Sequence, residues 1–187
     1  MKTTISSSLW LSIFFICCLT STLLCPASAI PDVNSSELAT QVCKNTTNFS
    51  FCKAAVYSDP RAPKADRYLL SYIVFGLAYK NATNTRDYID ISLKNMVGHA
   101  KPEIMEAMRK CQGDYKEALQ ALSEAISDLD SETFDGLDKL AIGVENSARD
   151  CEAGFDGKSL ILSEKNQNLI KLSNICYVVS KLYTVSE

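Results

Sequence analysis

The sequence predicts an all-α fold: an antiparallel up-down four-helix bundle, preceded by an N-terminal α-hairpin extension and held by two disulfides. Three observations lead to this prediction. Glycine and proline are scarce, with 7 and 5 of 187 residues, so few positions interrupt a helix. Alternation with a period of two, which marks a half-buried strand, is nearly absent. Apolar residues instead recur about every 3.5 residues, the spacing of helices packed in a bundle.

The chain begins with the features of an export signal. Lys2 precedes an apolar run from Leu9 to Leu24, and Ala27-Ser28-Ala29 fits the small-x-small cleavage rule. A transmembrane anchor is the alternative, but the run is shorter than the roughly 18–20 residues that span a bilayer. We expect a signal peptide over residues 1–29, a helical hairpin and linker over 30–62, and the bundle over 63–187. The secreted chain would then have no membrane contact.

Charge gives a second constraint on partners. The whole chain carries a net charge of -3, and cleavage would also remove Lys2. No run of Lys and Arg forms a basic patch, so we do not expect a nucleic-acid partner.

The hairpin expected ahead of the bundle runs from Asn34 to about Ser58 and holds Cys43 and Cys52. A link with two prolines, residues 59–63, follows it. Proline restricts its own backbone and that of the preceding residue, so the helix before this link should end there.

The first bundle helix is expected from Ala65 to about Val97. Its first half, Leu69 to Tyr79, is apolar on nearly all sides and should be the most buried element. The Asn81–Thr85 stretch is a candidate for a bend or break.

The other three bundle helices each show one apolar stripe. For the second, Pro102 suits the first turn. For the third, Ser131 is the expected N-cap and Gly154 the expected stop, and for the fourth Ser163 is the expected cap. The stripes are Ile104, Met108, Cys111, Tyr115, Ala118, Leu122, Ala125 and Leu129; then Phe134, Leu137, Ala141, Val144, Ala148 and Cys151; then Leu169, Leu172, Cys176, Val179 and Tyr183.

Cysteine spacing provides a test of this arrangement. If the second and third helices form a hairpin that turns at Asp130-Ser131, Cys111 and Cys151 lie twenty positions on either side of Ser131 and face each other on the apolar stripes. Cys43 and Cys52 flank a short turn in the same way. Export favours disulfides, so we predict the pairs Cys43–Cys52 and Cys111–Cys151.

Cys176 remains without a partner after cleavage of the signal. Its place on an apolar stripe predicts a buried free thiol, and intermolecular pairing is the alternative. Asn-x-Ser/Thr sequons at Asn34, Asn45, Asn48 and Asn81 are candidate glycosylation sites. Asn45 and Asn48 are too close for full occupancy of both.

A search for catalytic chemistry finds little. The chain has one histidine, His99, at an expected turn, and no nucleophile elbow, phosphate loop or dinucleotide motif. Acids such as Glu117, Glu124 and Asp128 fall on the polar faces of helices. We therefore expect no enzyme activity, no cofactor and no metal, and infer that the bundle acts by binding another protein.

Three segments then resemble the plant invertase and pectin methylesterase inhibitor family. The first is CKNTTNFSFCKAAVYSDPRAPKAD (Cys43–Asp66). The second is the single cysteine of MRKCQGDY, in which Cys111–Tyr115 are the last five residues. The third is CEAGF (Cys151–Phe155). The resemblance covers essentially the whole mature chain. It implies the same two disulfides, a four-helix bundle with a helical hairpin, and inhibition of a cell-wall or vacuolar carbohydrate enzyme by 1:1 protein binding.

The target is the harder question. Invertase inhibitors often carry Pro-Lys-Phe at the turn into the third helix, where this chain has Glu132, Thr133 and Phe134. Only the phenylalanine remains, and a glutamate near a carboxylate-rich site should cost affinity. Cys176 matches an unpaired cysteine of some pectin methylesterase inhibitors.

The resemblance therefore favours pectin methylesterase in the apoplast as the target, with the bundle covering the active-site cleft. Candidate contacts are Asp114, Glu117, Gln120 and Asp128. One alternative is inhibition of cell-wall or vacuolar invertase. A second is a secreted binding or allergen-type protein without inhibitory activity. The vacuole is the less expected location.

Overall fold

The computed structural model of the chain describes residues 35–155 and 160–184. The predicted signal peptide and the sequon at Asn34 lie outside these ranges. Within them, the chain is helical and contains no strand. The helices are α2 (Ser35–Lys44), α3 (Phe49–Val56), the short 3-10 helix η1 (Ala62–Lys64), α4 (Arg67–Met96), α5 (Pro102–Asp130), α6 (Leu137–Gly154) and α7 (Leu160–Ser180).

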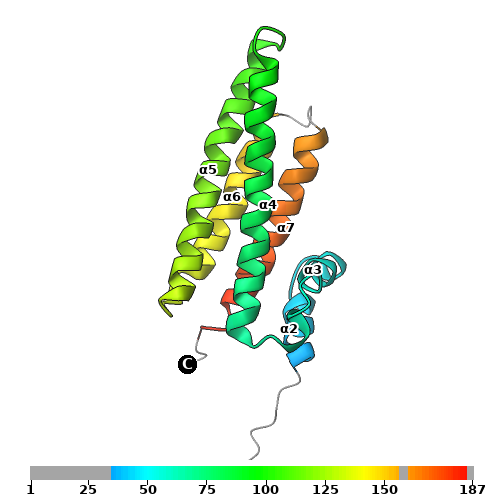
Figure 1. Cartoon of the computed structure of the whole chain (residues 1–187), viewed down its shortest axis with the longest axis vertical. Helices are drawn as coiled ribbons and strands as arrows, with labels where there is room; N and C mark the ends of the chain where they lie inside the picture. The colour runs from blue at the N-terminus through cyan, green and yellow to red at the C-terminus, as the bar shows by residue number, and fades with distance from the viewer. Residues whose placement is uncertain (1–34, 156–159, 185–187) are drawn as a thin grey trace, which may run out of the picture. The chain divides into compact units, whose positions relative to one another are not determined.

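The four long helices α4–α7 lie side by side with alternating direction (Figure 1). Each contacts two neighbours, in the cyclic order α4, α5, α6, α7 and back to α4. Helices α2 and α3 form a hairpin that contacts α7. The predicted bundle and its hairpin extension are therefore confirmed. The expected domain boundary between residues 62 and 63 falls inside η1 and stays a prediction.

Helix α4 is the first bundle helix and runs for 30 residues without a break. Asp66 caps it by accepting the Leu69 N–H at 2.8 Å. Of the expected bend or break at Asn81–Thr85, the break is wrong, because α4 is continuous there. Thr85 is buried, and its hydroxyl donates to the Asn81 carbonyl at 2.9 Å. The polar side chain is thus satisfied within the helix, which can continue through this stretch.

The turn between α5 and α6 differs from the expected one. Ser131 is the C-cap of α5 and not the N-cap of α6, and its hydroxyl donates to the Ser127 carbonyl at 2.6 Å. Phe134 lies in the turn, because α6 begins only at Leu137. Positive φ angles at Glu132 (56°) and Gly136 (101°) take the backbone out of the right-handed helical region. The reversal therefore takes several residues more than the sequence suggested.

The expected cap Ser163 instead lies within α7, which begins at Leu160. Its hydroxyl donates to Glu152 Oε1 at 2.5 Å. Ser163 therefore bonds a side chain of α6 and does not cap α7. Glu152 Oε2 also accepts from Asn166 Nδ2 at 2.8 Å, and Asn166 Oδ1 accepts from the Tyr115 hydroxyl at 2.9 Å. Asn166 and Tyr115 are fully buried. This polar network joins α5, α6 and α7 through the core.

Both predicted disulfides are present. Cys43 and Cys52 have their Cα atoms 5.3 Å apart, and those of Cys111 and Cys151 are 4.5 Å apart. Loop-closure entropy gives stabilisation of about 2.7 kcal/mol for the short ring and about 4 kcal/mol for the long one. Cys176 is a buried free thiol, and burial raises its pKa, so it is held in the unreactive protonated form.

Candidate protein-binding face

The hairpin of α5 and α6 is built on the two apolar stripes that the sequence showed. Met108, Cys111, Tyr115, Leu122 and Leu129 are buried along α5. Their partners on α6 are Leu137, Ala141, Val144, Ala148 and Cys151, also buried. The stripes and the disulfide fix the two helices against each other, and the polar residues are left on the outer side.

The candidate contact residues share that outer side of α5. Asp114, Glu117, Gln120 and Asp128 are separated by steps of three, three and eight residues, which keep them on one side of the helix. Glu117 and Gln120 are exposed, while Asp114 and Asp128 are half-buried. We name the surface formed by Lys110, Asp114, Glu117, Gln120, Ala121, Asp128 and Asp150 the α5–α6 face.

Lys110 links the two helices across this face. Its ammonium donates to Asp114 Oδ2 at 2.9 Å and to the Asp150 carbonyl on α6 at 2.9 Å. The Lys110 Cδ atom lies 3.7 Å from the position that a Cβ atom would take at Gly154. Neither Lys110 nor Asp150 was among the residues expected from the sequence, although the i, i+4 spacing of Lys110 and Asp114 indicates an ion pair.

Acidic crowding on the face shows in the pKa of Asp114. Partial burial raises this pKa, and the Lys110 ammonium opposes the rise. The negative charges of Asp150 and Glu117 raise it further. Between residues 101 and 155 the chain carries about twice as many acidic as basic side chains. Among the residues that define the face, Lys110 is the one cation beside four acids, so the face carries a net negative charge.

The turn after α5 is anchored to the rest of the fold. The Tyr68 hydroxyl donates to the Leu129 carbonyl at 2.6 Å, and the Tyr72 hydroxyl donates to Asp130 Oδ1. The bond to Asp130 raises the pKa of Tyr72. The end of α5 is thus fixed to the start of α4.

Phe134 is held by the same end of the bundle. Its ring stacks on Tyr183 with centroids 4.1 Å apart and planes at 14°. It also meets Tyr68 edge-on at 6.3 Å. Phe134 therefore packs against its own fold. Glu132 and Thr133 are exposed beside it, and the Thr133 N–H donates to the Asp128 carbonyl at 2.9 Å.

The predicted site residues thus fall into two groups, one on the side of α5 and one at the α5–α6 turn, which Asp128 adjoins. In the described residues, no group of three or more His, Cys, Asp or Glu is arranged to hold a metal ion. His99 is exposed near the α4–α5 turn. A search of the same residues for a helix long and apolar enough to span a membrane finds none. What the outer surface offers is a charged, covalently fixed helix face.

Comparison with known proteins gives the family. Residues 37–179 match the family model "Plant invertase/pectin methylesterase inhibitor". The chain is 29% identical over 175 residues to the pectinesterase inhibitor of Actinidia deliciosa, covering 93% of this chain and 91% of that protein. It is 31% identical over 150 residues to cell wall / vacuolar inhibitor of fructosidase 2 of Arabidopsis thaliana, covering 79% and 82%.

A solved structure agrees on the fold. The crystal structure of a mutant form of a pectin methylesterase inhibitor from Arabidopsis superimposes with a TM-score of 0.68 at 20% identity, covering 77% of this chain and 95% of that one. The family match spans most of the chain and includes both disulfides, the hairpin and the bundle. The chain belongs to the plant invertase/pectin methylesterase inhibitor family.

Proposed function

We propose that the chain is a secreted inhibitor of pectin methylesterase that acts by steric masking. The α5–α6 face docks over the cleft of the esterase and excludes the polysaccharide. The chain itself performs no catalysis in this account. The pectinesterase inhibitor among its relatives supports the choice of target.

The observation that carries the proposal is the rigidity and length of the α5–α6 face. Cys111–Cys151 fixes α5 to α6, and Lys110 ties them again on the surface. Helix α5 has 29 residues, which is about 43 Å of helix. A stable interface needs roughly 800 Å² from each partner, and a helix pair of this length offers that area. A preformed surface loses little conformational entropy on binding.

The position of Phe134 favours the side of the helices over the turn as the contact. An aromatic that inserts into a partner's site must leave the surface of its own protein. Phe134 is instead stacked on Tyr183, so insertion would first break that stack, at a cost of about 0.5–1.5 kcal/mol in addition to exposing the ring.

A second candidate function is inhibition of invertase. It is supported by the 31% identity to an inhibitor of fructosidase and by the exposure of Glu132 and Thr133 at the turn. In this mode the turn would approach the sucrose-binding cleft. The negative charge of Glu132 would then face a carboxylate-rich site and weaken binding.

A titration separates the two functions. Purified mature protein is added to a plant pectin methylesterase and, separately, to a cell-wall invertase. Loss of esterase activity near a 1:1 ratio is the expected result, and inhibition of invertase alone would contradict it. Residual turnover of pectin or sucrose by the protein alone, surviving repurification, would contradict the absence of catalysis.

Charge reversal locates the contact. Glu117→Lys changes the α5–α6 face and should weaken esterase inhibition at least tenfold, because like-charge contacts replace complementary ones; Asp128→Lys is made separately and should act in the same direction. Glu164→Lys, which changes the net charge equally, is the control for each of these single variants, since Glu164 is an exposed acid on α7. Equal loss in the control would mean that net charge, and not this face, determines inhibition.

We also propose the cell wall as the place of action. The relatives named as cell wall / vacuolar inhibitors and the predicted signal peptide support this location. A fluorescent fusion at the C-terminus, imaged in plasmolysed plant cells, should label the wall; labelling of the vacuole alone would favour the alternative.

A further inference from the structure

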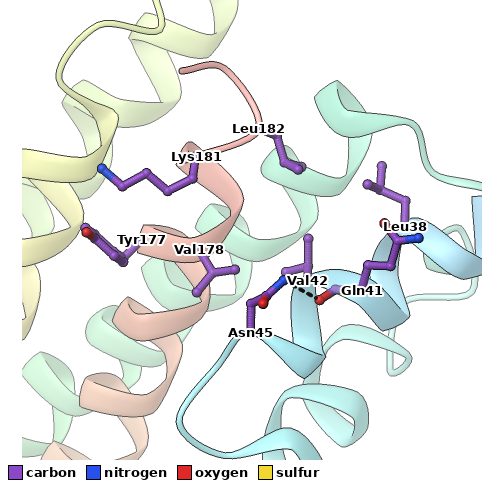
Figure 2. Close-up of a pocket in the computed structure, with 8 residues that line it drawn as sticks. All are labelled: Leu38, Gln41, Val42, Asn45, Tyr177, Val178, Lys181 and Leu182. Atoms are coloured by element: carbon purple, nitrogen blue, oxygen red, sulfur yellow. Dashed lines mark hydrogen bonds between the residues drawn. The ribbon is translucent and has the colours of Figure 1, made fainter. Parts of the chain in front are cut away.

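An open apolar groove lies between α2 of the hairpin and α7 of the bundle (Figure 2). Its volume is about 360 Å³. Leu38 and Val42 line it from α2, and Tyr177, Val178 and Leu182 from α7 and the residues just after it. Val42 is buried, whereas the other four side chains keep partial exposure. These side chains leave a small apolar surface open to solvent.

Asn45 stands at this groove. It is one of the eight lining residues, and Figure 2 shows its side chain beside Val42 at the end of α2. Asn45 is exposed and begins the sequon Asn45-Thr46-Thr47. Its amide nitrogen donates one N–H to the Gln41 carbonyl at 3.0 Å. An amide nitrogen carries two hydrogens, so the second is available for substitution.

The two other described sequons do not line this groove. Asn48 is also exposed, but it follows α2 outside the groove, and its Oδ1 caps α3 by accepting the Phe51 N–H at 3.0 Å. Asn81 lies in the middle of α4, is half-buried, and has a buried Oδ1 atom. Of the three, only Asn45 is both exposed and part of the groove lining.

We propose that Asn45 carries an N-linked glycan whose first sugar rings cover the α2–α7 groove. The donor class is a lipid-linked oligosaccharide diphosphate of the secretory route. The bond from the sugar C1 to the diphosphate oxygen breaks, a bond from C1 to Asn45 Nδ2 forms, Nδ2 loses one proton, and the lipid diphosphate leaves. The C–H face of a pyranose ring can then pack on the aliphatic lining, which removes apolar area from water. The Tyr177 ring already has the Lys181 ammonium 4.6 Å from its centroid.

The placement has a consequence for binding. The sequons of the chain are at Asn34, Asn45, Asn48 and Asn81, and none lies on α5 or α6. A glycan is bulky and solubilising, so a glycan at Asn45 leaves the α5–α6 face free for a partner. The proposal rests on the export assumed in the proposed function but not on the identity of the target enzyme.

The test compares two hosts. The full-length chain, with its own leader, is produced in plant cells and recovered from the medium, and the chain from Ile30 is produced in bacteria without glycans. Mass spectrometry of glycopeptides should find Asn45 occupied more often than Asn48 or Asn81. Asn45→Gln should lower the Tm of the plant protein by about 2–4 °C and raise the fluorescence of a dye that binds apolar surface.

The bacterial pair isolates the role of the sugar. In that host Asn45→Gln should change the Tm by less than about 1 °C, because only the contact with Gln41 is altered. An equal Tm shift in both hosts would mean that the effect comes from the Asn45 side chain itself, and would overturn the proposal that a glycan covers the groove. Asn48→Asp, which keeps the capping oxygen, is the matched control and should leave dye binding unchanged.

Two further results would overturn the proposal. One is secreted protein with an unmodified Asn45. If that protein inhibits the esterase, the proposed function is supported and the proposed glycan at Asn45 is rejected. The other is a glycan at Asn45 whose enzymatic removal changes neither the Tm nor dye binding, since the sugar would then not touch the groove. Failure to recover the chain from the medium would contradict the export on which both proposals depend.

Discussion

The molecule contains two helical hairpins, each with one disulfide, and the two disulfides have different structural roles. In the α2–α3 hairpin, Cys43–Cys52 closes a ring of sequence separation 9, and the loop is tied to α7 by Thr47, whose N–H donates to Asn174 Oδ1 at 2.9 Å. In the α5–α6 hairpin, Cys111–Cys151 closes a separation of 40 inside the bundle core. The first hairpin covers part of α7, whereas the second holds half of the bundle.

Charge follows the same division. The α5–α6 hairpin carries about two acids for each base, while the rest of the chain is net basic. Removal of Cys43–Cys52 should therefore affect only the α2–α3 hairpin that covers part of α7. Removal of Cys111–Cys151 should affect both the bundle core and the acidic α5–α6 face.

The largest expected effect comes from the long disulfide. Cys111→Ala with Cys151→Ala should lower the free energy of unfolding by about 4 kcal/mol, and Cys43→Ala with Cys52→Ala by about 2.7 kcal/mol, because the unfolded chain gains less entropy when the shorter ring is opened. Urea unfolding of both double variants measures the two values. Equal losses, or the reverse order, would break the comparison.

The polar network in the core comes next. Asn166→Leu should destabilise the bundle by about 2–3 kcal/mol, because the buried Tyr115 hydroxyl loses its acceptor and Glu152 loses a donor. Ser163→Ala removes a contact at the half-exposed edge of the same network and should cost less. Thermal unfolding of both proteins shows the order, and a larger loss for Ser163→Ala would argue against a core role for the network.

Phe134 sharpens the distinction between the turn and the α5–α6 face. Phe134→Ala should cost about 1–2 kcal/mol of stability, through lost stacking on Tyr183 and lost burial. Esterase inhibition should persist at a temperature where the variant is folded. Circular dichroism and an inhibition titration give the two values. A folded variant that no longer inhibits the esterase would place Phe134 in the contact.

The smallest effect compares one carboxyl near each hairpin. Arg61 lowers the pKa of Asp59 to about 2, whereas burial raises the pKa of Asp114 above its ordinary range. Stability from Asp59 is present above the unfolded pKa and is lost as pH falls toward about 2. Asp114 has the opposite sign: the folded state binds more protons, so its contribution to stability falls as pH rises through the window just above the ordinary pKa.

Carboxyl NMR titration measures both groups. We expect Asp59 to titrate below and Asp114 above the ordinary range. Arg61→Gln should raise the Asp59 pKa toward that range, with the N–H of residue 61 still bonded to Asp59 Oδ1, and should not move Asp114. Asp114 titrating below Asp59 would contradict the burial of Asp114 and its acidic neighbours on the α5–α6 face.

The apolar stripes and the cysteine spacing allowed most of the fold to be predicted. Cys111 and Cys151 lie on the buried stripes of α5 and α6, and periodicity reports burial directly. Helix ends were less predictable, since they depend on tertiary contacts. Ser131 and Ser163 both have the chemistry of a cap, yet one ends α5 and the other bonds Glu152 in the core.

The candidate site was predictable in part. Helical spacing placed Asp114, Glu117, Gln120 and Asp128 on one side of α5. The inward packing of Phe134 was not predictable, because it depends on Tyr183, 49 residues further along the chain. The link from Lys110 to the Asp150 carbonyl likewise joins two helices, and a contact across helices leaves no periodic signal in the sequence.

A single engineered glycan tests most directly whether the α5–α6 face masks an esterase. Ala121→Asn creates the sequon Asn-Leu-Ser at residues 121–123, at a half-buried position on this face, and Ala121→Gln is the control without a sequon. In protein secreted from plant cells, occupancy of residue 121 should abolish inhibition of pectin methylesterase, while Ala121→Gln should keep most of it. Full inhibition by the occupied variant would contradict the account.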